Sequence, residues 1–180
     1  MPRSSSPLSP SPPDVGKAGG GITLRPAVED DRTFLFWVYS STRADELAVV
    51  PWTDEQKGAF LRMQFDAQDS WYHQVYPDGT FLVVLREGTP IGRLYVARLS
   101  TEVIVVDIAL IPEHRGQGIG SRLLADVLAA ADRDALPITL HVEPWNPARR
   151  LYERLGFETK EQGEVYETMV RPARQLNTAS

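Results

Sequence analysis

Three glycines stand close together in the run Arg115-Gly116-Gln117-Gly118-Ile119-Gly120, directly before a segment with helical spacing. Glycine lets a backbone turn tightly and approach a ligand without obstruction by a Cβ atom. The first N–H groups of a helix have no partner within it, and the helix dipole adds positive potential there. Residues 116–121 therefore predict a cradle for an anion such as a pyrophosphate, to which Arg115 can add a charge and Ser121 a hydroxyl.

The glycines alone do not decide between this cradle and a tight strand-to-helix turn with no ligand. Two familiar phosphate motifs are excluded. A P-loop requires Lys followed by Ser or Thr after its last glycine, and these residues are missing here. The dinucleotide fingerprint G-x-G-x-x-G belongs near the first strand of a domain, whereas this G-x-G-x-G lies late in the chain.

The elements that must position this run follow from hydrophobic periodicity and from turn residues. The pattern predicts a chain order of β-α-α-β-β-β-α-β-α-β-β. Val103 to Ile111 is an almost continuous apolar run, typical of a strand that is buried on both faces. With the helix at 118–133 and the strand at 138–142 it predicts a parallel strand–helix–strand unit. The remaining strands are expected at 22–25, 80–86, 91–99, 157–161 and 165–170.

Capping residues predict where the helices begin and end. Asp30 or Asp31 can cap a first helix, and Thr53 with Gln56 forms a capping box for a second helix, which has Phe60, Met63 and Ala67 on one face. The aromatic run from Trp71 to Tyr76 is interpreted as a loop. Asn146 is the expected N-cap of the last helix, Pro147 its first residue and Gly156 the left-handed residue after its end.

Taken together, residues 22–170 resemble the GNAT acyltransferase superfamily. Arg115, Gly118 and Gly120 fill its acyl-CoA motif, Arg/Gln-x-x-Gly-x-Gly/Ala. The strand Val-Asp-Ile-Ala-Leu-Ile-Pro at 106–112 is similar to the family's fourth strand, and Asn146 to Phe157 is similar to its later Asn…Leu-Tyr…Leu-Gly-Phe motif. The resemblance implies an α/β fold with a mixed, mostly antiparallel sheet of about seven strands, flanked by about four helices.

The resemblance also implies acetyl-CoA as cosubstrate. Pantetheine would lie between splayed fourth and fifth strands, paired with the backbone of Ala109, Leu110 and Ile111, and the pyrophosphate would sit on residues 116–121. Tyr152 matches the family's helix tyrosine and would protonate the departing sulfur, although a packing tyrosine is the structural alternative. Asn146 would contact the cofactor, although a helix cap already has a structural role.

The general base has several candidates, of which Asp107 is preferred to His141. Asp107 interrupts an apolar strand, where burial of a carboxylate costs free energy and therefore suggests a specific role. His141 lies on the fifth strand, where some members of the family place a catalytic carboxylate, and imidazole titrates near neutrality. A structural hydrogen bond is the alternative for either residue. Glu102 and Glu143 at strand ends, or a water relay with no single base, also remain open.

Residues 30–80 carry no motif for one acceptor. Trp52, Trp71, Tyr72 and Tyr76 could wall an acceptor pocket or could form a small hydrophobic cluster. The leading hypothesis is an N-acetyltransferase that acts on a primary amine of a small molecule. The alternatives are a protein or peptide N-acetyltransferase, which needs an open groove, and a non-catalytic acyl-CoA-binding regulator.

Composition narrows the function classes further. The 180 residues are 42% hydrophobic and 24% charged, which predicts a globular protein with a core of its own. A formal net charge of −5 argues against a nucleic-acid binder. No apolar run approaches the roughly 20 residues that span a bilayer, so no membrane partner is expected. The absence of cysteine excludes disulfides and fits a cytoplasmic protein.

Domain organisation follows from the same composition. Residues 1–20 are rich in Ser, Pro and Gly and are expected to form a disordered tail. One domain is expected over 21–172, with a short C-terminal tail at 173–180. The three histidines have no metal-ligand spacing, so no metal site is predicted. Relatives in the family often dimerise, so a homodimer is a further expectation.

Overall fold

The computed structural model describes residues 20–174, and the tails expected at 1–20 and 173–180 lie almost wholly outside them. The described chain builds a seven-stranded sheet with the order β1-β2-β3-β4-β5-β7-β6. Its strands are β1 (Ile22–Pro26), β2 (Thr80–Arg86), β3 (Thr89–Arg98), β4 (Val103–Leu110), β5 (Ile138–Val142), β6 (Glu158–Gln162) and β7 (Glu167–Arg171). Neighbouring strands are antiparallel except for β4 and β5, which confirms the predicted mixed sheet.

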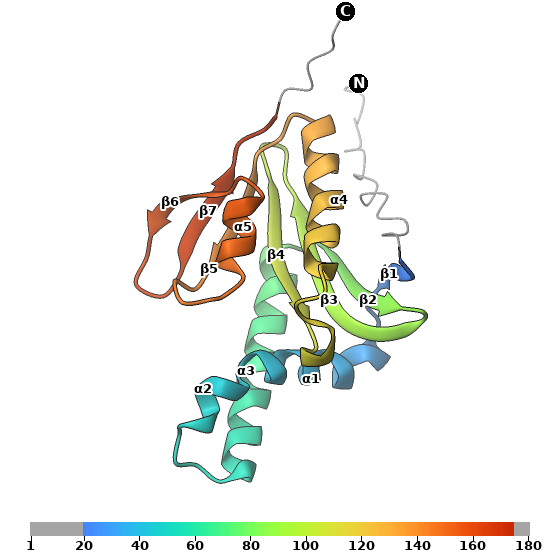
Figure 1. Cartoon of the computed structure of the whole chain (residues 1–180). Coiled ribbons are helices and arrows are strands. Elements are labelled where there is room, and N and C mark those ends of the chain that lie inside the picture. Colours follow the sequence, from blue (N-terminus) through green and yellow to red (C-terminus); the bar gives the residue numbers. More distant parts are fainter. Residues whose placement is uncertain (1–19, 175–180) are drawn as a thin grey trace, which may run out of the picture.

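Five α-helices accompany the sheet within the described residues: α1 (Arg32–Thr42), α2 (Ala44–Ala48), α3 (Asp54–Val75), α4 (Ile119–Arg133) and α5 (Arg149–Arg154). Two 3-10 helices, η1 (Glu29–Asp31) and η2 (Pro112–His114), precede α1 and follow β4. In Figure 1, α4 lies in front of the sheet and α3 behind it, so the sheet is covered on both faces. The short helix α2 had no counterpart among the expected elements.

The larger hydrophobic core lies between the sheet and α4. The apolar stripe of α4 is buried as its spacing predicted, with Leu123, Leu124 and Ala131 fully inaccessible. Burial of one such leucine contributes about 1.5–3 kcal/mol relative to exposure. A smaller cluster joins Leu35 and Tyr39 of α1 to Phe65 of α3 and to the sheet. These two cores fix α4 and α3 on the sheet, and both helices carry parts of the site.

Helix α3 begins as expected and continues further than expected. Thr53 Oγ1 accepts the Gln56 N–H (3.2 Å), and Gln56 Oε1 accepts the Thr53 N–H (3.0 Å), which completes the predicted capping box. The helix then runs to Val75, so the interpretation of residues 71–76 as a loop was wrong for all but its last residue. Phe65 is its one buried residue, and Met63 is 58% exposed, because the first half of α3 projects beyond the sheet (Figure 1).

Asp31 does not cap α1 with its side chain. Its carboxylate instead accepts the Val28 N–H (2.9 Å) and a pair of hydrogen bonds from Arg25 (2.6 and 2.7 Å). The hydrogen bond from Arg25 lowers the pKa of Asp31, and the Val28 N–H lowers it further. Asp31 therefore ties the end of β1 to η1 and sets the direction in which α1 leaves the sheet.

Candidate active site

Strands β4 and β5 separate in the middle of the sheet. They pair only where Val103 to Val105 face Ile138 to Leu140. On its other side β4 carries a bulge at Val106, since Asp107 lies opposite Tyr95 and Val105 lies opposite Val96. Beyond the bulge, β4 pairs with β3 alone, and residues 106–110 are half-buried instead of buried on both faces as predicted. The β5-facing edge of β4 is therefore open over these residues.

The backbone of residues 109–111 is only partly available on this edge. Ala109 lines the cleft described below, and the side chains of all three residues pack on the core. The Leu110 carbonyl accepts a hydrogen bond from Arg115 Nε (2.8 Å), and the Ile111 N–H donates to the Ile91 carbonyl (2.9 Å). Because backbone groups alternate along a strand, those of Ala109 and Ile111 face β3, and Leu110 is the residue of the three whose backbone faces the open edge.

The glycine run forms the turn from η2 into α4. Gly116 and Gly118 have left-handed φ values of 70° and 76°, and a Cβ atom built on either residue meets no atom within 4 Å. Gly118 caps α4, and its carbonyl accepts the Arg122 N–H (3.2 Å), so the earlier N–H groups emerge at the helix end. The open space above two glycines at a helix N-terminus fits a pyrophosphate.

The polar side chains of the run brace the turn. Arg115 Nη2 donates to Ser41 Oγ on α1 (2.9 Å), in addition to the bond of its Nε to β4. Gln117 accepts from Arg86 Nη1 (2.8 Å) and donates to the Glu113 carbonyl (2.7 Å). Ile119 is buried in the core, and Gly120 and Ser121 are half-buried. In this arrangement the backbone is the part of the run that is presented to a ligand.

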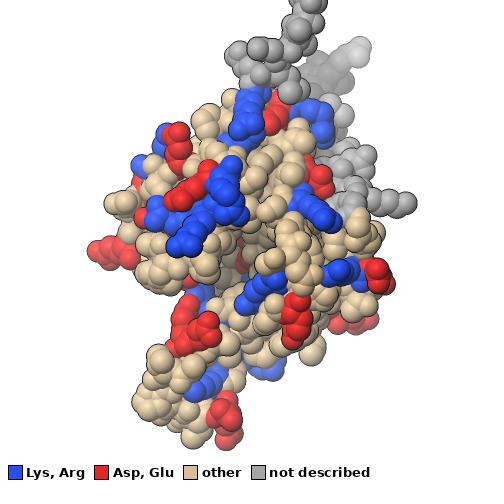
Figure 2. Space-filling view, viewed as in Figure 1, with Lys and Arg blue, Asp and Glu red and all other residues tan. Residues whose placement is uncertain are grey.

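A cleft of about 550 Å³ opens between the separated strands and α3, and it includes Asp107, His141 and Tyr152 among its lining residues. It corresponds to the hollow in the middle of the face shown in Figure 2, which has Lys and Arg side chains on its rim. The three candidate catalytic residues come from β4, β5 and α5, which are brought together only by the sheet. Asn146 and Ala109 line the same cleft.

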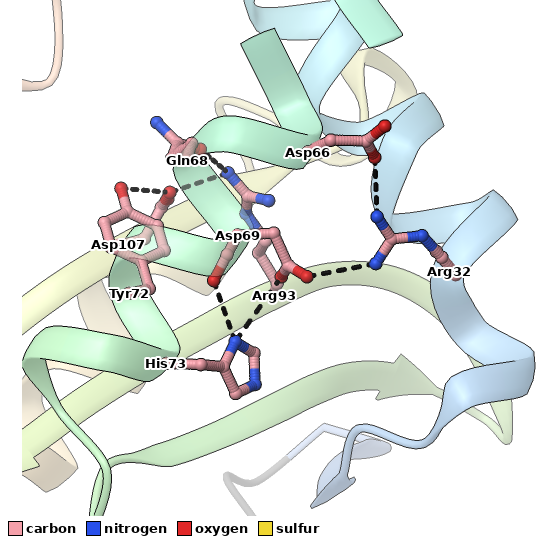
Figure 3. Close-up of polar contacts among 8 residues, drawn as sticks. All are labelled: Arg32, Asp66, Gln68, Asp69, Tyr72, His73, Arg93 and Asp107. Carbon is pink, nitrogen blue, oxygen red and sulfur yellow. Dashed lines mark hydrogen bonds and ion pairs between the residues drawn. The ribbon is translucent and has the colours of Figure 1, made fainter. Parts of the chain in front are cut away.

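Asp107 is held by two partners (Figure 3). Its Oδ2 accepts hydrogen bonds from Arg93 Nη2 (2.6 Å) and from the Tyr72 hydroxyl (3.1 Å). Arg93 is only 3% exposed, donates also to Gln68 Oε1 (3.2 Å), and lies 5.3 Å from the centroid of the Tyr95 ring. The strand position of Asp107 is therefore explained by an ion pair, and Oδ1 has no hydrogen-bond partner among residues 20–174.

Tyr152 is buried on α5, with its ring edge-to-face against Phe157 at 6.0 Å. Burial raises the pKa of Tyr152 to about 12, and the negative charge of Asp107 contributes to the shift. The hydroxyl therefore keeps its proton at neutral pH and can act as a donor. The same physical causes, burial first and the Asp107 charge second, raise the pKa of Tyr72.

His141 and the two candidate glutamates have different surroundings. His141 is exposed on β5, and its Nδ1 shares a hydrogen bond with Thr168 Oγ1 on β7 (3.2 Å). Glu143 forms an ion pair with Arg43 between α1 and α2 (2.8 Å), and Glu102 accepts from the Thr139 hydroxyl (2.5 Å). Both glutamates are occupied by protein partners, whereas His141 offers its other ring nitrogen.

Asn146 organises the turn before α5. Its Oδ1 accepts the Ala148 N–H (2.9 Å) and its carbonyl accepts the Arg149 N–H (3.0 Å). The helix begins at Arg149, two residues later than Pro147, so the predicted capping position was wrong. The tight turn at Asn146–Ala148 precedes the helix. Gly156 has the expected left-handed φ, at 92°.

Some residues of the cleft were not predicted from the sequence, and others were predicted to lie in the wrong element. Trp71, Tyr72 and Tyr76 line it, but from the end of α3, while Trp52 packs on Phe60 elsewhere (5.3 Å between ring centroids). Arg93 was not identified. The signal for it was available, because Arg93 interrupts one apolar strand as Asp107 interrupts the next. Opposite charges in two adjacent buried strands indicate a pair.

Among residues 20–174, no group of three or more His, Cys, Asp or Glu could hold a metal ion. None of the helices in this part of the chain is both long and apolar enough to cross a membrane.

The sequence profile of the acetyltransferase (GNAT) family matches residues 42–157. One curated relative, from Bacillus subtilis (strain 168), is named as a proposed ribosomal protein bS18-alanine N-acetyltransferase, and it is 30% identical over 95 residues. Another is the mycothiol acetyltransferase of Brachybacterium faecium, 34% identical over 101 residues. The matches cover 51% and 52% of this chain, and they span 63% and 27% of the two relatives.

Solved structures share the fold. The PaiA N-acetyltransferase of Thermoplasma acidophilum, solved in complex with coenzyme A, superposes with a TM-score of 0.66 at 19% identity, and the match covers 84% of this chain and 98% of that chain. PH1933 from Pyrococcus horikoshii OT3 superposes with a TM-score of 0.63 at 17% identity, over 85% and 99% of the two chains.

Proposed function

Since the chain belongs to the acetyltransferase (GNAT) family, we propose that it transfers an acetyl group from acetyl-CoA to a primary amine of a small molecule, by direct attack in a ternary complex. The observation that carries this proposal is the convergence of Tyr152, Asp107 and His141 on one cleft, at the place where β4 and β5 separate. The glycine turn at the start of α4 supports it with a cradle for the pyrophosphate of the cosubstrate.

In this proposal the backbone of residues 116–121 binds the pyrophosphate. The segment from Ala109 to Ile111 aligns the pantetheine through the Leu110 backbone, which faces the open edge of β4. Asn146 contacts the cosubstrate from the start of the α5 turn. Acetyl-CoA supplies the thioester carbon that the amine attacks and the sulfur that leaves. The nitrogen of the acceptor ammonium must lose two protons, one before and one after it attacks, and the sulfur must gain one.

Tyr152 is the proposed acid. Its buried hydroxyl is protonated at neutral pH, since burial raises the pKa of Tyr152 to about 12. As the carbon–sulfur bond breaks, the phenolic proton passes to the sulfur. The negative charge of the Asp107 carboxylate, in the same cleft, also raises the pKa of Tyr152 and so keeps the phenol protonated until the sulfur leaves.

The base is assigned to His141 or Asp107. Asp107 Oδ2 already accepts hydrogen bonds from Arg93 and Tyr72, and this favours His141 as the base. Oδ1 is then suited to anchoring the acceptor's ammonium, while the free nitrogen of His141 takes the proton directly or through one water. The new C–N bond replaces the C–S bond. The first proton of the nitrogen leaves on the base, and the second, lost after the attack, restores the phenol of Tyr152.

A peptide or protein amino terminus is the second candidate acceptor. Two observations favour it: the similarity to a proposed ribosomal protein N-acetyltransferase, and the exposure of Trp71 and Tyr166 on the cleft, at 51% and 48%. An exposed aromatic rim can support a longer chain. A regulator that binds acyl-CoA without turnover is the remaining alternative.

Release of free thiol from acetyl-CoA tests the proposal. The panel contains diamines, amino acids, arylalkyl amines and a peptide with an amino-terminal alanine. Amine-dependent release with an acetylated product supports transfer, and the preferred member separates a small molecule from a peptide. Binding of acetyl-CoA with no amine-dependent release from any member would identify a regulator.

A further inference from the structure

A second cavity, of about 590 Å³, lies next to β1 and β2 on a different face of α3 from the cleft. Phe65, Asp69 and His73, spaced by four residues on α3, point into it, whereas Gln68 and Tyr72 line the cleft. Leu35, Phe65 and Leu82 give it a buried apolar floor. The proposed transfer reaction uses none of these residues. We call this space the α1–α3 cavity.

The rim of the α1–α3 cavity is acidic. Arg32 forms ion pairs with Asp66 (2.5 Å) and Asp69 (3.1 Å), as Figure 3 shows, and Glu29 is an exposed residue of the lining. The lining contains Glu29, Asp69 and Arg32, so its net charge is −1 when His73 is neutral, and Asp66 beside Arg32 adds a negative charge next to it. An anion would meet repulsion there, and a cation would gain Coulomb energy.

Aromatic residues line the same space. The His73 ring stacks on Phe81, with centroids 4.2 Å apart and planes at 17°, and Phe81 meets Tyr95 edge-on at 4.9 Å. Ring faces attract a cation that has been partly removed from water. A volume in this range, with an apolar floor and a few polar groups, is typical of small-molecule sites.

We propose that the α1–α3 cavity binds a small organic cation with an apolar body. The cationic group lies between Glu29 and Asp69, and the body covers Leu35, Phe65 and Phe81. The proposal concerns binding alone and does not depend on the transfer reaction.

Benzyltrimethylammonium is a suitable probe. Its quaternary nitrogen has no lone pair and cannot accept an acetyl group, so a result with it is separate from the proposed function. Benzyl alcohol and phenylacetate are matched neutral and anionic probes. The cation is expected to bind, by calorimetry, at least several-fold more tightly than either, and to weaken as salt screens the rim.

The three histidines of the chain report on three different places. His73 lines the α1–α3 cavity, His141 lines the cleft, and His114 lies 3.3 Å from Arg86 beside the glycine turn. In an NMR titration of the imidazole signals, the cation should shift His73 and leave His141 and His114 in place. A shift of His141 without His73 would place the cation in the cleft and overturn the proposal.

Matched variants complete the test. Glu29→Lys replaces an exposed rim charge and should weaken binding by about tenfold. Asp126→Lys makes the same charge change on an exposed position of α4 and should leave binding unchanged. Equal losses in the two variants would show a general charge effect, and a loss in Asp107→Asn with none in Glu29→Lys would show binding in the cleft. Either result, or no binding by the wild-type chain, overturns the proposal.

Discussion

Tyr152 is buried, and the negative charge of Asp107, which lines the same cleft, acts on its hydroxyl. A phenol in such surroundings can serve as an acid or can simply fill space. The two roles differ in what a change to phenylalanine does, because phenylalanine keeps the ring and removes the proton.

We expect Tyr152→Phe to lower kcat by roughly ten- to ten-thousand-fold with little change in KM for acetyl-CoA. Steady-state kinetics with the acceptor found in the amine panel measures this. The variant should melt near the wild-type temperature, since the contact with Phe157 is kept. Wild-type turnover would assign Tyr152 to packing alone.

The pH profile of kcat should lack an alkaline limb from Tyr152 below about pH 11. A group with a pKa of about 12 stays protonated throughout the usual assay range, so its loss of a proton begins only above that range. A profile from pH 5 to 10.5 checks this. A limb near pH 9 that disappears in Tyr152→Phe would contradict the raised pKa of Tyr152, although it would still identify Tyr152 as the acid.

Asp107 and His141 can be separated by the acidic limb of kcat/KM. The base must be deprotonated, so its removal in Asp107→Asn or His141→Gln should abolish the acidic limb and most of the rate. We expect this outcome for His141→Gln. Asp107→Asn should raise KM for the acceptor and keep the limb, because its carboxylate is held by Arg93 and Tyr72. If both variants keep the limb, a water relay is the better account.

At the scale of elements, the turn into α4 and the tie between α4 and β7 decide whether the site can form. The turn depends on two left-handed glycines with open space above them. The tie is the ion pair of Arg171 with Asp132 (both bonds 2.8 Å), which anchors the last strand of the described chain to the end of α4.

Gly118→Val should abolish the rise in melting temperature that acetyl-CoA produces, because a branched side chain would fill the space proposed for the pyrophosphate. The variant also strains a left-handed residue. Gly88→Val is the matched control, since Gly88 has φ 82° and equally open surroundings in the β2–β3 hairpin. The control should lose stability but keep the rise in melting temperature that acetyl-CoA produces. Loss of this rise in both variants would contradict the proposed pyrophosphate site.

Asp132→Asn should lower the free energy of unfolding by about 2 kcal/mol at pH 7, because it leaves the buried Arg171 without its charge partner. The hydrogen bond from Arg171 lowers the pKa of Asp132 below its unfolded value. The stabilisation is therefore present above about pH 4 and is lost as the pH falls through the lower, folded pKa. Denaturant titrations at pH 7 and pH 3.5 measure this, and an equal difference at both pH values would contradict it.

At the scale of the whole molecule, the cosubstrate should stabilise the fold by mass action. Acetyl-CoA at about a thousand times its Kd would add about 4 kcal/mol, which is several degrees in Tm for a domain of this size. ATP and NAD should do less, because the turn matches neither of their motifs. A larger shift with NAD would count against the family's cosubstrate in this chain. The expected homodimer stays a prediction.

Local signals were enough to predict where the strands lie along the chain, the glycine turn and the capping box at Thr53. Each of these signals depends on residues that are close together in the sequence, such as the apolar stripe of α4 or the left-handed turn at Gly118. They failed at the end of α3, where aromatic residues suggested a loop, because a helix that lines a cleft has no simple apolar stripe.

The sequence by itself thus determined the fold class and the motif for the cosubstrate. Opposite charges in adjacent strands indicated that Asp107 and Arg93 could pair, but only the tertiary structure decided that Tyr72 joins them and that His141 and Tyr152 share the cleft of Asp107. These residues come from β4, β3, α3, β5 and α5. The bulge at Val106 also breaks the alternation by which a strand's faces are assigned from sequence. Contacts between distant segments depend on how the strands twist, bulge and separate, and no local pattern encodes that geometry.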